Sequence, residues 1–147
     1  LNRVLEKNLN QNMFLTMFYG LYEEMNHLLY CSSAGHEPGY IYRAETEQFE
    51  EIDVRGRVLG VSQKTRYNQQ EIPIYLEDLI IIFTDGVTEA RNREGEFIDK
   101  DKLLNLIQKY KHMHPQDIVQ IIYEGILKVQ NPSRKDDMTI LIIKRVN

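Results

Sequence analysis

The stretch Leu79-Ile80-Ile81-Ile82-Phe83-Thr84-Asp85-Gly86 predicts a buried strand that ends in an acidic turn. Its apolar run suits both faces of a strand, which is typical of the centre of a sheet. A second apolar run, residues 138–143, begins directly after Asp136-Asp137. If the two strands are antiparallel neighbours, both acidic motifs lie at the same edge of one sheet. Clustered carboxylates repel one another unless a positive charge lies between them, and their hard oxygens suit Mg²⁺ or Mn²⁺. The sequence therefore predicts half or more of a metal site at this edge.

Length and charge narrow the class of protein. At 147 residues the chain is long enough for one domain with a sizeable core. Its net charge of −4 and the lack of a basic stripe with interleaved aromatic residues argue against nucleic acid as a partner. No apolar run approaches the ~20 residues of a membrane span, and no signal peptide opens the chain, so we expect no membrane insertion. The single cysteine, Cys31, excludes an internal disulfide and fits a reducing, cytoplasmic compartment. A buried strand position is its simplest role.

Periodicity predicts a run of strands, then two helices and a returning strand. Leu1, Val4, Leu5 and Leu9 fall at helical spacing, so we expect the chain to open in a helix that ends near Leu9. Aromatic and β-branched content predicts the strands, and a single apolar face predicts the helices. The expected strands are 13–23, 27–33, 40–43, 49–52, 69–75, 79–83 and 138–146, and the expected helical segments are 87–91, 100–110 and 115–129, the last stopped by Asn131-Pro132-Ser133. Residues 34–39 and 55–67 are expected to be loops. This order indicates an α+β layered architecture.

Each acidic motif by itself has a simpler explanation. Asp-Gly after a strand is usually a turn, and a pair of aspartates is usually solvated. The two motifs gain weight together, because each adjoins an unusually apolar strand and the helices between them allow those strands to be neighbours. Gly86 would also let the backbone approach a ligand or a water molecule closely.

Five motifs, in order along nearly the whole chain, resemble those of one enzyme family. They are Met13-Phe14-Leu15-Thr16-Met17-Phe18, Ser33-Ala34-Gly35-His36-Glu37-Pro38-Gly39, Val58-Leu59-Gly60-Val61, Phe83-Thr84-Asp85-Gly86-Val87-Thr88-Glu89-Ala90 and Lys135-Asp136-Asp137-Met138-Thr139. With them the chain resembles the SpoIIE/RsbU group of bacterial metal-dependent serine/threonine phosphatases. This group lies within the wider protein phosphatase 2C-like (PPM) family.

The resemblance implies a PPM-type fold, a sandwich of two antiparallel sheets flanked by helices, with two Mn²⁺ or Mg²⁺ ions at one sheet edge. It implies hydrolysis of phosphoserine or phosphothreonine on a bacterial signalling protein. In this group the substrate is a phosphorylated anti-sigma-factor antagonist with a STAS fold, and the reaction controls a stress sigma factor. By motif, Asp85 and Asp136 are metal ligands, with Gly86 and Asp137 as further candidates; Asp137 is favoured as a neighbour of the ligands or a strand cap. The two ions would lower the pKa of a shared water, and the resulting hydroxide would attack phosphorus in line.

The chain departs from the family at its start. An upstream Asp and an Asp-Gly pair that normally complete the two-ion site are absent from residues 1–147. We therefore expect these residues to be the C-terminal portion of a single PPM-type domain, to bind metal weakly and to have little activity alone. An upstream sensor or activator, whether a domain or a separate protein, would act through the helix that ends near Leu9. Two alternatives stay open: a non-catalytic phosphatase-fold interaction module, and a different binuclear-metal hydrolase for small phosphoesters. The oligomeric state is open, and a homodimer is compatible with the sequence.

Other polar residues near the motifs have weaker claims to a role. His36 could bind the substrate phosphate, order its loop or ligate a metal, and ordering the loop is favoured. Glu89 either supports the ligands from the first helical turn or is a solvated charge. His112 and His114 have a metal-like spacing but no neighbouring ligands, so a surface position is favoured. Four cations flank the acidic motifs and could attract a phosphate, although scattered surface charge is the default explanation: Arg91, Arg93, Arg134 and Lys135.

Overall fold

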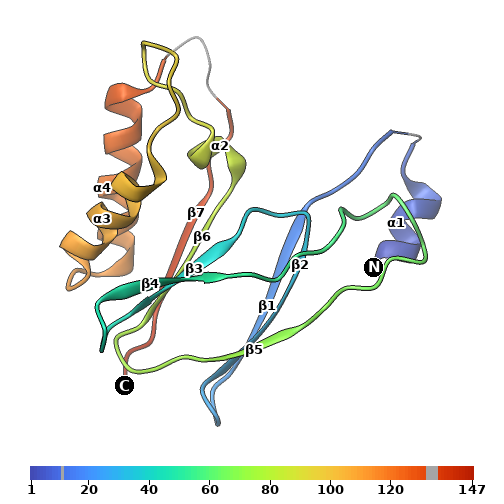
Figure 1. Cartoon of the computed structure of the whole chain (residues 1–147), viewed down its shortest axis with the longest axis horizontal. Coiled ribbons are helices and arrows are strands. Elements are labelled where there is room, and N and C mark those ends of the chain that lie inside the picture. The colour runs from blue at the N-terminus through green and yellow to red at the C-terminus, as the bar shows by residue number, and fades with distance from the viewer. Residues whose placement is uncertain (11, 132–135) are drawn as a thin grey trace. The chain divides into compact units, whose positions relative to one another are not determined.

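Two compact units make up the described chain (Figure 1). The computed structural model describes residues 1–10, 12–131 and 136–147. The first unit comprises Leu1–Glu37 and Asp53–Ile74, and the second comprises Pro38–Ile52 and Tyr75–Asn147. Each unit has its own antiparallel sheet, so the predicted pair of antiparallel sheets with accompanying helices is confirmed.

The first unit holds a three-stranded sheet and one short helix. Its elements are α1 (Asn2–Asn8), β1 (Met17–Glu23), β2 (Leu28–Ala34) and β5 (Gln70–Pro73), and the strand order is β1-β2-β5. Helix α1 confirms the predicted opening helix, but its buried residue is the polar Asn2, whereas Leu1 and Val4 are exposed. Cys31 is buried in the central strand β2, as predicted, and this burial raises the pKa of its thiol.

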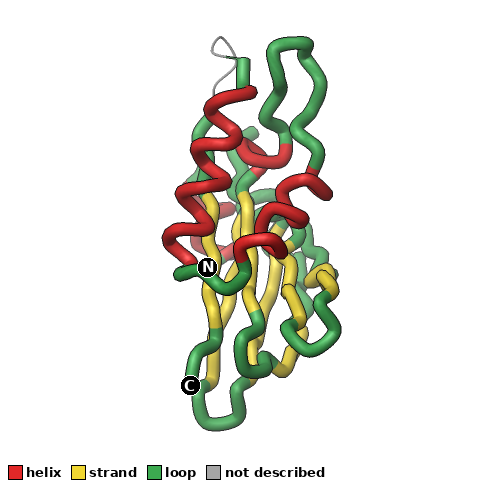
Figure 2. The backbone as a smooth tube through the Cα atoms, turned by 90° about the vertical axis from the view of Figure 1, so that its left-hand side faces the viewer, coloured by secondary structure: helices red, strands yellow, loops and turns green. Residues whose placement is uncertain are grey.

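The second unit holds a four-stranded sheet covered by two helices. The strand order is β4 (Gln48–Ile52), β3 (Gly39–Arg43), β6 (Leu79–Phe83) and β7 (Ile140–Lys144), with every neighbouring pair antiparallel. Helices α3 (Lys100–Tyr110) and α4 (Pro115–Val129) pack over one face of this sheet (Figure 2). Ile118, Ile122 and Ile126 form the buried stripe of α4 that its apolar spacing predicts. Strand β6 lies inside the sheet, which explains why its residues are apolar on both faces.

Capping residues fix the starts of the two long helices. The Asp99 carboxylate accepts the Asp101 backbone N–H (2.9 Å) at the start of α3, and Pro115 occupies the first turn of α4. The predicted bounds 100–110 and 115–129 are therefore confirmed. Pro132 and Ser133, predicted to stop α4 from beyond its end, lie outside the described residues.

Several predicted boundaries differ from the structure, and the differences are largest at three elements. The strand predicted from residue 13 begins at Met17, because residues 13–16 contribute only an isolated bridge from Leu15 to Leu59. The helical turn predicted over 87–91 is α2 (Asp85–Thr88), which begins earlier because Thr84 takes the N-cap position. The last strand, predicted over 138–146, is the shorter β7 (Ile140–Lys144). Within the described residues, no helix is both long and apolar enough to cross a membrane.

Candidate metal centre

The pairing of β6 with β7 brings the two acidic motifs to the same end of the sheet. The last pair in register is Phe83 with Ile140. Beyond it, the Thr84 backbone N–H donates to the Thr139 carbonyl (3.1 Å), and the Thr139 N–H donates to the Thr84 hydroxyl (2.9 Å). The predicted antiparallel neighbourhood of the two strands is confirmed. Asp85 directly follows Thr84, and Asp136 lies three residues before Thr139.

Gly86 lets the turn after β6 touch the segment that leads into β7. An ideal Cβ placed on Gly86 would lie 2.1 Å from the Asp137 carbonyl oxygen, far inside van der Waals contact. Only a residue without a side chain permits this approach, so glycine is required here for space rather than for backbone conformation. The contact ties the Asp85 motif to the Asp136 motif.

Both candidate ligands keep part of their hydrogen-bonding capacity. One Asp85 carboxylate oxygen, Oδ1, accepts the Gly86 N–H (2.9 Å), and Oδ1 of Asp136 accepts the Asp137 N–H (2.8 Å). Both side chains are exposed, and among the described residues neither has an ion-pair partner. An ionised carboxylate has about four acceptor positions, so each has room for a further electropositive ligand. Hard divalent cations take such oxygens.

The two carboxylates do not make a complete ligand set by themselves. In the part of the chain that the structure describes, no group of three or more His, Cys, Asp and Glu side chains could hold a metal ion. Asp137 is exposed, and its carbonyl rather than its carboxylate makes the contact with Gly86. Glu89 follows α2 as its C-cap, with its N–H donating to the Asp85 carbonyl (2.7 Å), and its side chain is exposed.

The cations near the motifs are largely engaged elsewhere or exposed. Arg91 donates from Nη1 to the Gly95 carbonyl (2.8 Å), and its guanidinium lies 3.8 Å from the centre of the Phe97 ring. Arg93 is exposed. The default explanation of local surface structure therefore fits Arg91 better than phosphate attraction. Arg134 and Lys135 lie outside the described residues.

The histidines take structural positions. His36 belongs to the first unit, whereas Asp85 and Asp136 belong to the second. Its Nδ1 lies 3.0 Å from the Glu37 carbonyl, and its ring meets the Phe18 ring edge-on, which fits the favoured loop-ordering role. His112 is exposed, as predicted for a surface residue. His114 is exposed too, but its Nδ1 accepts the Gln116 N–H (3.3 Å) as the N-cap of α4.

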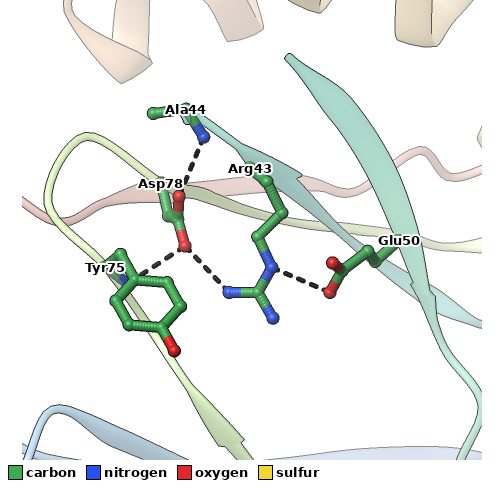
Figure 3. A network of polar contacts seen from close by, with 5 residues as sticks. All are labelled: Arg43, Ala44, Glu50, Tyr75 and Asp78. Carbon is green, nitrogen blue, oxygen red and sulfur yellow. Dashed lines mark hydrogen bonds and ion pairs between the residues drawn. The ribbon is translucent and has the colours of Figure 1, made fainter. Parts of the chain in front are cut away.

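A buried carboxylate at the other end of β6 escaped the sequence reasoning. Asp78 accepts hydrogen bonds from Arg43 Nη1 (2.8 Å), the Ala44 N–H (2.9 Å) and the Tyr75 N–H (3.0 Å), and Arg43 Nε donates to Glu50 (2.8 Å) (Figure 3). The sequence offered one signal, an arginine at the end of the apolar strand β3. Its carboxylate joins the turn before β6 to the end of β3 through these three hydrogen bonds, so its role is structural.

Comparison with known sequences points to one family. The family model described as Stage II sporulation protein E (SpoIIE) matches residues 1–146. The chain is 39% identical over 145 residues to phosphoserine phosphatase RsbU of Bacillus subtilis (strain 168). This match covers 99% of the chain and 43% of RsbU, so the chain spans less than half the length of that relative.

Solved structures show the same fold. The SiaA-PP2C domain of Pseudomonas aeruginosa superposes with a TM-score of 0.82 at 15% identity, over 98% of this chain and 57% of that one. The catalytic domain of the serine threonine protein phosphatase PstP, in complex with 2 manganese ions, superposes with a TM-score of 0.71 at 15% identity, over 99% of this chain and 67% of that one. At these identities the likeness establishes the fold, which is that of protein phosphatase 2C-like domains.

Proposed function

The chain belongs to the SpoIIE family, and from that membership we propose that it takes part in metal-dependent hydrolysis of phosphoserine or phosphothreonine on a bacterial signalling protein. Its similarity to a phosphoserine phosphatase along 99% of its length supports the reaction class. The fold shared with protein phosphatase 2C-like domains supports it independently.

One observation carries the proposal: Asp85 and Asp136 share one end of the β6–β7 pair, and each has acceptor positions to spare. Their exposed carboxylates suit Mn²⁺ or Mg²⁺, two ions in a complete domain. When bound, such ions supply a water of lowered pKa and shield the phosphoryl charge. The chain's own part is positional: Asp85 and Asp136 hold the ions, the Gly86 contact keeps the motifs together, and the Thr84–Thr139 hydrogen bonds fix the strand ends.

The substrate we propose is a phosphorylated anti-sigma-factor antagonist of the STAS type, so that the reaction controls a stress sigma factor. The resemblance to the RsbU group supports this choice, as does the similarity to RsbU itself. We place the reaction in the cytoplasm, where a free, buried thiol such as Cys31 persists. An upstream sensor or activator would regulate it.

We also propose that residues 1–147 form the C-terminal portion of one phosphatase domain. The match to 57% of the SiaA domain and 67% of the PstP domain supports this. The pair of carboxylates without a third described ligand is in keeping with it. The same observation also favours a second candidate, a phosphatase-fold module that binds phosphoprotein without turnover.

Hydrolysis of a phosphoserine protein by the full-length protein, followed as Mn²⁺ is titrated, separates the two candidates. Loss of an outer-shell partner of a metal already costs about 10- to 100-fold in activity, so we expect Asp85→Asn and Asp136→Asn each to cost at least about 100-fold. Asp117→Asn, a matched change of an exposed aspartate in the first turn of α4, should leave the rate unchanged. Binding of the phosphoprotein without Mn²⁺-dependent turnover would instead establish the interaction module, and near-wild-type rates in either site variant would refute the ligand assignment.

A further inference from the structure

A strongly basic loop stands out in the first unit. Residues 55–66, named here the basic loop, contain Arg55, Arg57, Lys64 and Arg66 and no acidic residue, whereas the whole chain has a net charge of −4. The loop connects β4 with β5. Because the rest of the chain is net acidic, anions are attracted mainly to this positive segment.

The four cations surround a single hollow. A neighbouring cavity of about 550 Å³, which shares Thr65 with the hollow, is largely apolar. The hollow itself, about 420 Å³, is lined by all four cations together with Gly56, Ser62 and Thr65. All four cationic side chains are exposed. Nε of Arg55 lies 2.6 Å from Asp53 Oδ1, but among the described residues the other three have no ion-pair partner. Three positive charges around the hollow are therefore uncompensated.

Buried contacts hold the basic loop in place. The Asn2 side chain, buried in α1, donates to the Ser62 carbonyl (2.8 Å) and accepts the Gly60 N–H (2.9 Å). An ideal Cβ on Gly56 would lie 2.2 Å from the Ser33 carbonyl of β2, so the loop also rests on the sheet. In Figure 1 this segment is the green loop that passes α1. A loop fixed before binding loses less conformational entropy when a partner docks.

The basic loop also packs against the loop that carries His36. Gly35 has φ +70°, and a Cβ there would lie 2.4 Å from Val58 Cγ1. The two loops correspond to two of the motifs that carry the family resemblance. Arg55 and Arg57 therefore lie just before Val58-Leu59-Gly60-Val61, which is one of these motifs.

We propose that the basic loop is a docking surface for an acidic segment of the phosphoprotein substrate, with Arg57, Lys64 and Arg66 facing carboxylates of that segment. This inference rests on the proposed function. Exposed cations of this kind act on encounter and on selection among substrates more than on the chemical step. Since the rest of the chain is net acidic, an acidic partner is repelled elsewhere and attracted here.

The test measures binding and needs no turnover. Two fluorescein-labelled phosphoserine peptides are compared by fluorescence anisotropy with the full-length protein: one flanked by glutamates, the other by glutamines. Because exposed ion pairs each contribute modestly, we expect the wild type to prefer the glutamate peptide by about 5-fold or more at low salt. The preference should fall toward 1 in about 0.3 M NaCl, where screening is strong.

Charge reversal identifies the surface responsible. The triple variant Arg57→Glu/Lys64→Glu/Arg66→Glu should lose the preference. Lys102→Glu, an exposed residue of α3 in the second unit, should keep it. Equal binding of both peptides by the wild type, an equal loss in Lys102→Glu, or tighter binding of a single-stranded DNA oligonucleotide than of the glutamate peptide would each overturn the proposal.

Turnover is scored separately on the same peptides with Mn²⁺. Failure of the wild type to hydrolyse either peptide, together with an intact glutamate preference, would count against the phosphatase function and not against the docking surface. Hydrolysis of both peptides without a binding preference for the glutamate peptide would count against the docking surface and not against the phosphatase function.

Discussion

Asp78 and Asp85 stand at the two ends of the same strand, β6, and differ in almost every physical respect. The Asp78 side chain is 1% exposed and accepts three hydrogen bonds, from Arg43, Ala44 and Tyr75. Asp85 is exposed and accepts one described hydrogen bond with its carboxylate, from its neighbour Gly86. Buried polar groups are almost always hydrogen-bonded, and the Asp78 carboxylate is bonded to donors of its own chain. The Asp85 carboxylate has capacity left for a ligand.

The buried end also shows how the fold keeps a charge inside. Burial lowers the pKa of the Arg43 guanidinium, but hydrogen bonds and charge attraction from Asp78 and Glu50 outweigh it and raise that pKa overall. Removing the buried carboxylate of such a network is costly, because buried donors lose their acceptor. The contrast therefore predicts large stability effects at the Asp78 end and small ones at the Asp85 end.

The largest effect should come from Asp78→Ala. Loss of this carboxylate removes the acceptor of the Arg43 Nη1 donor and of two backbone N–H groups, and breaking a buried pair costs about 3–5 kcal/mol. Urea unfolding monitored by circular dichroism measures the loss. Glu50→Gln, which removes the exposed partner of the same arginine, should cost under about 1 kcal/mol. Equal losses of unfolding free energy in the two variants would show that the buried and the exposed carboxylate do not differ in their contribution to stability.

A smaller effect is expected at the other end, from Gly86→Ala. The added methyl group would meet the Asp137 carbonyl, and overpacking of this kind costs about 1–3 kcal/mol. Because the contact joins the two acidic motifs, Mn²⁺ affinity should fall as well. Gly125→Ala is the matched control: a Cβ there meets nothing within 4 Å, so the change within α4 should stabilise the protein by about 0.5–1 kcal/mol. A stability for Gly86→Ala equal to that of the wild type would mean that the two motifs are not held by this contact.

The smallest effect concerns the ion pair between exposed Glu47, in the hairpin between β3 and β4, and half-buried Lys111, which follows α3. A hydrogen bond with Lys111 holds the pKa of Glu47 below its usual range. A carboxyl group whose pKa is lowered in the folded state stabilises the fold at pH values above its pKa in the unfolded state. This contribution is lost as the pH falls through the lowered, folded-state pKa. The melting temperature of Glu47→Gln should therefore lie below that of the wild type at neutral pH and converge with it as the pH falls below the usual range of a glutamate pKa. Glu45→Gln, which changes a nearby exposed residue without a described ion pair, should show no such convergence. If the difference in melting temperature between Glu47→Gln and the wild type stayed constant with pH, the effect would not come from the charge of Glu47.

Sequence patterns predicted the parts of the fold that depend on local order. Helix α4 was predictable because Pro115 starts it and its isoleucines recur on one face. The neighbourhood of Asp85 and Asp136 was predictable because two short apolar runs each adjoin an acidic motif, and antiparallel pairing turns that adjacency into proximity.

Features that depend on distant partners were not predictable in this way. Glu77-Asp78 looks like an ordinary polar turn, and only its contact with Arg43 makes Asp78 a buried residue. The basic loop shows no periodicity, and its contacts with Asn2 and Ser33 join residues that are far apart in the sequence. Likewise, the capping role of His114 depends on the direction of its side chain.

A double-mutant cycle for Mn²⁺ binding tests the shared metal site most directly. Isothermal titration of Mn²⁺ into the full-length protein would be compared for the wild type, Asp85→Asn, Asp136→Asn and the double variant. If both carboxylates serve the same centre, each single change should lower affinity at least about 10-fold, and the double variant should lose far less than the sum of the two losses. Unchanged affinity in either single variant, or losses that simply add, would contradict a shared metal centre at the end of β6 and β7.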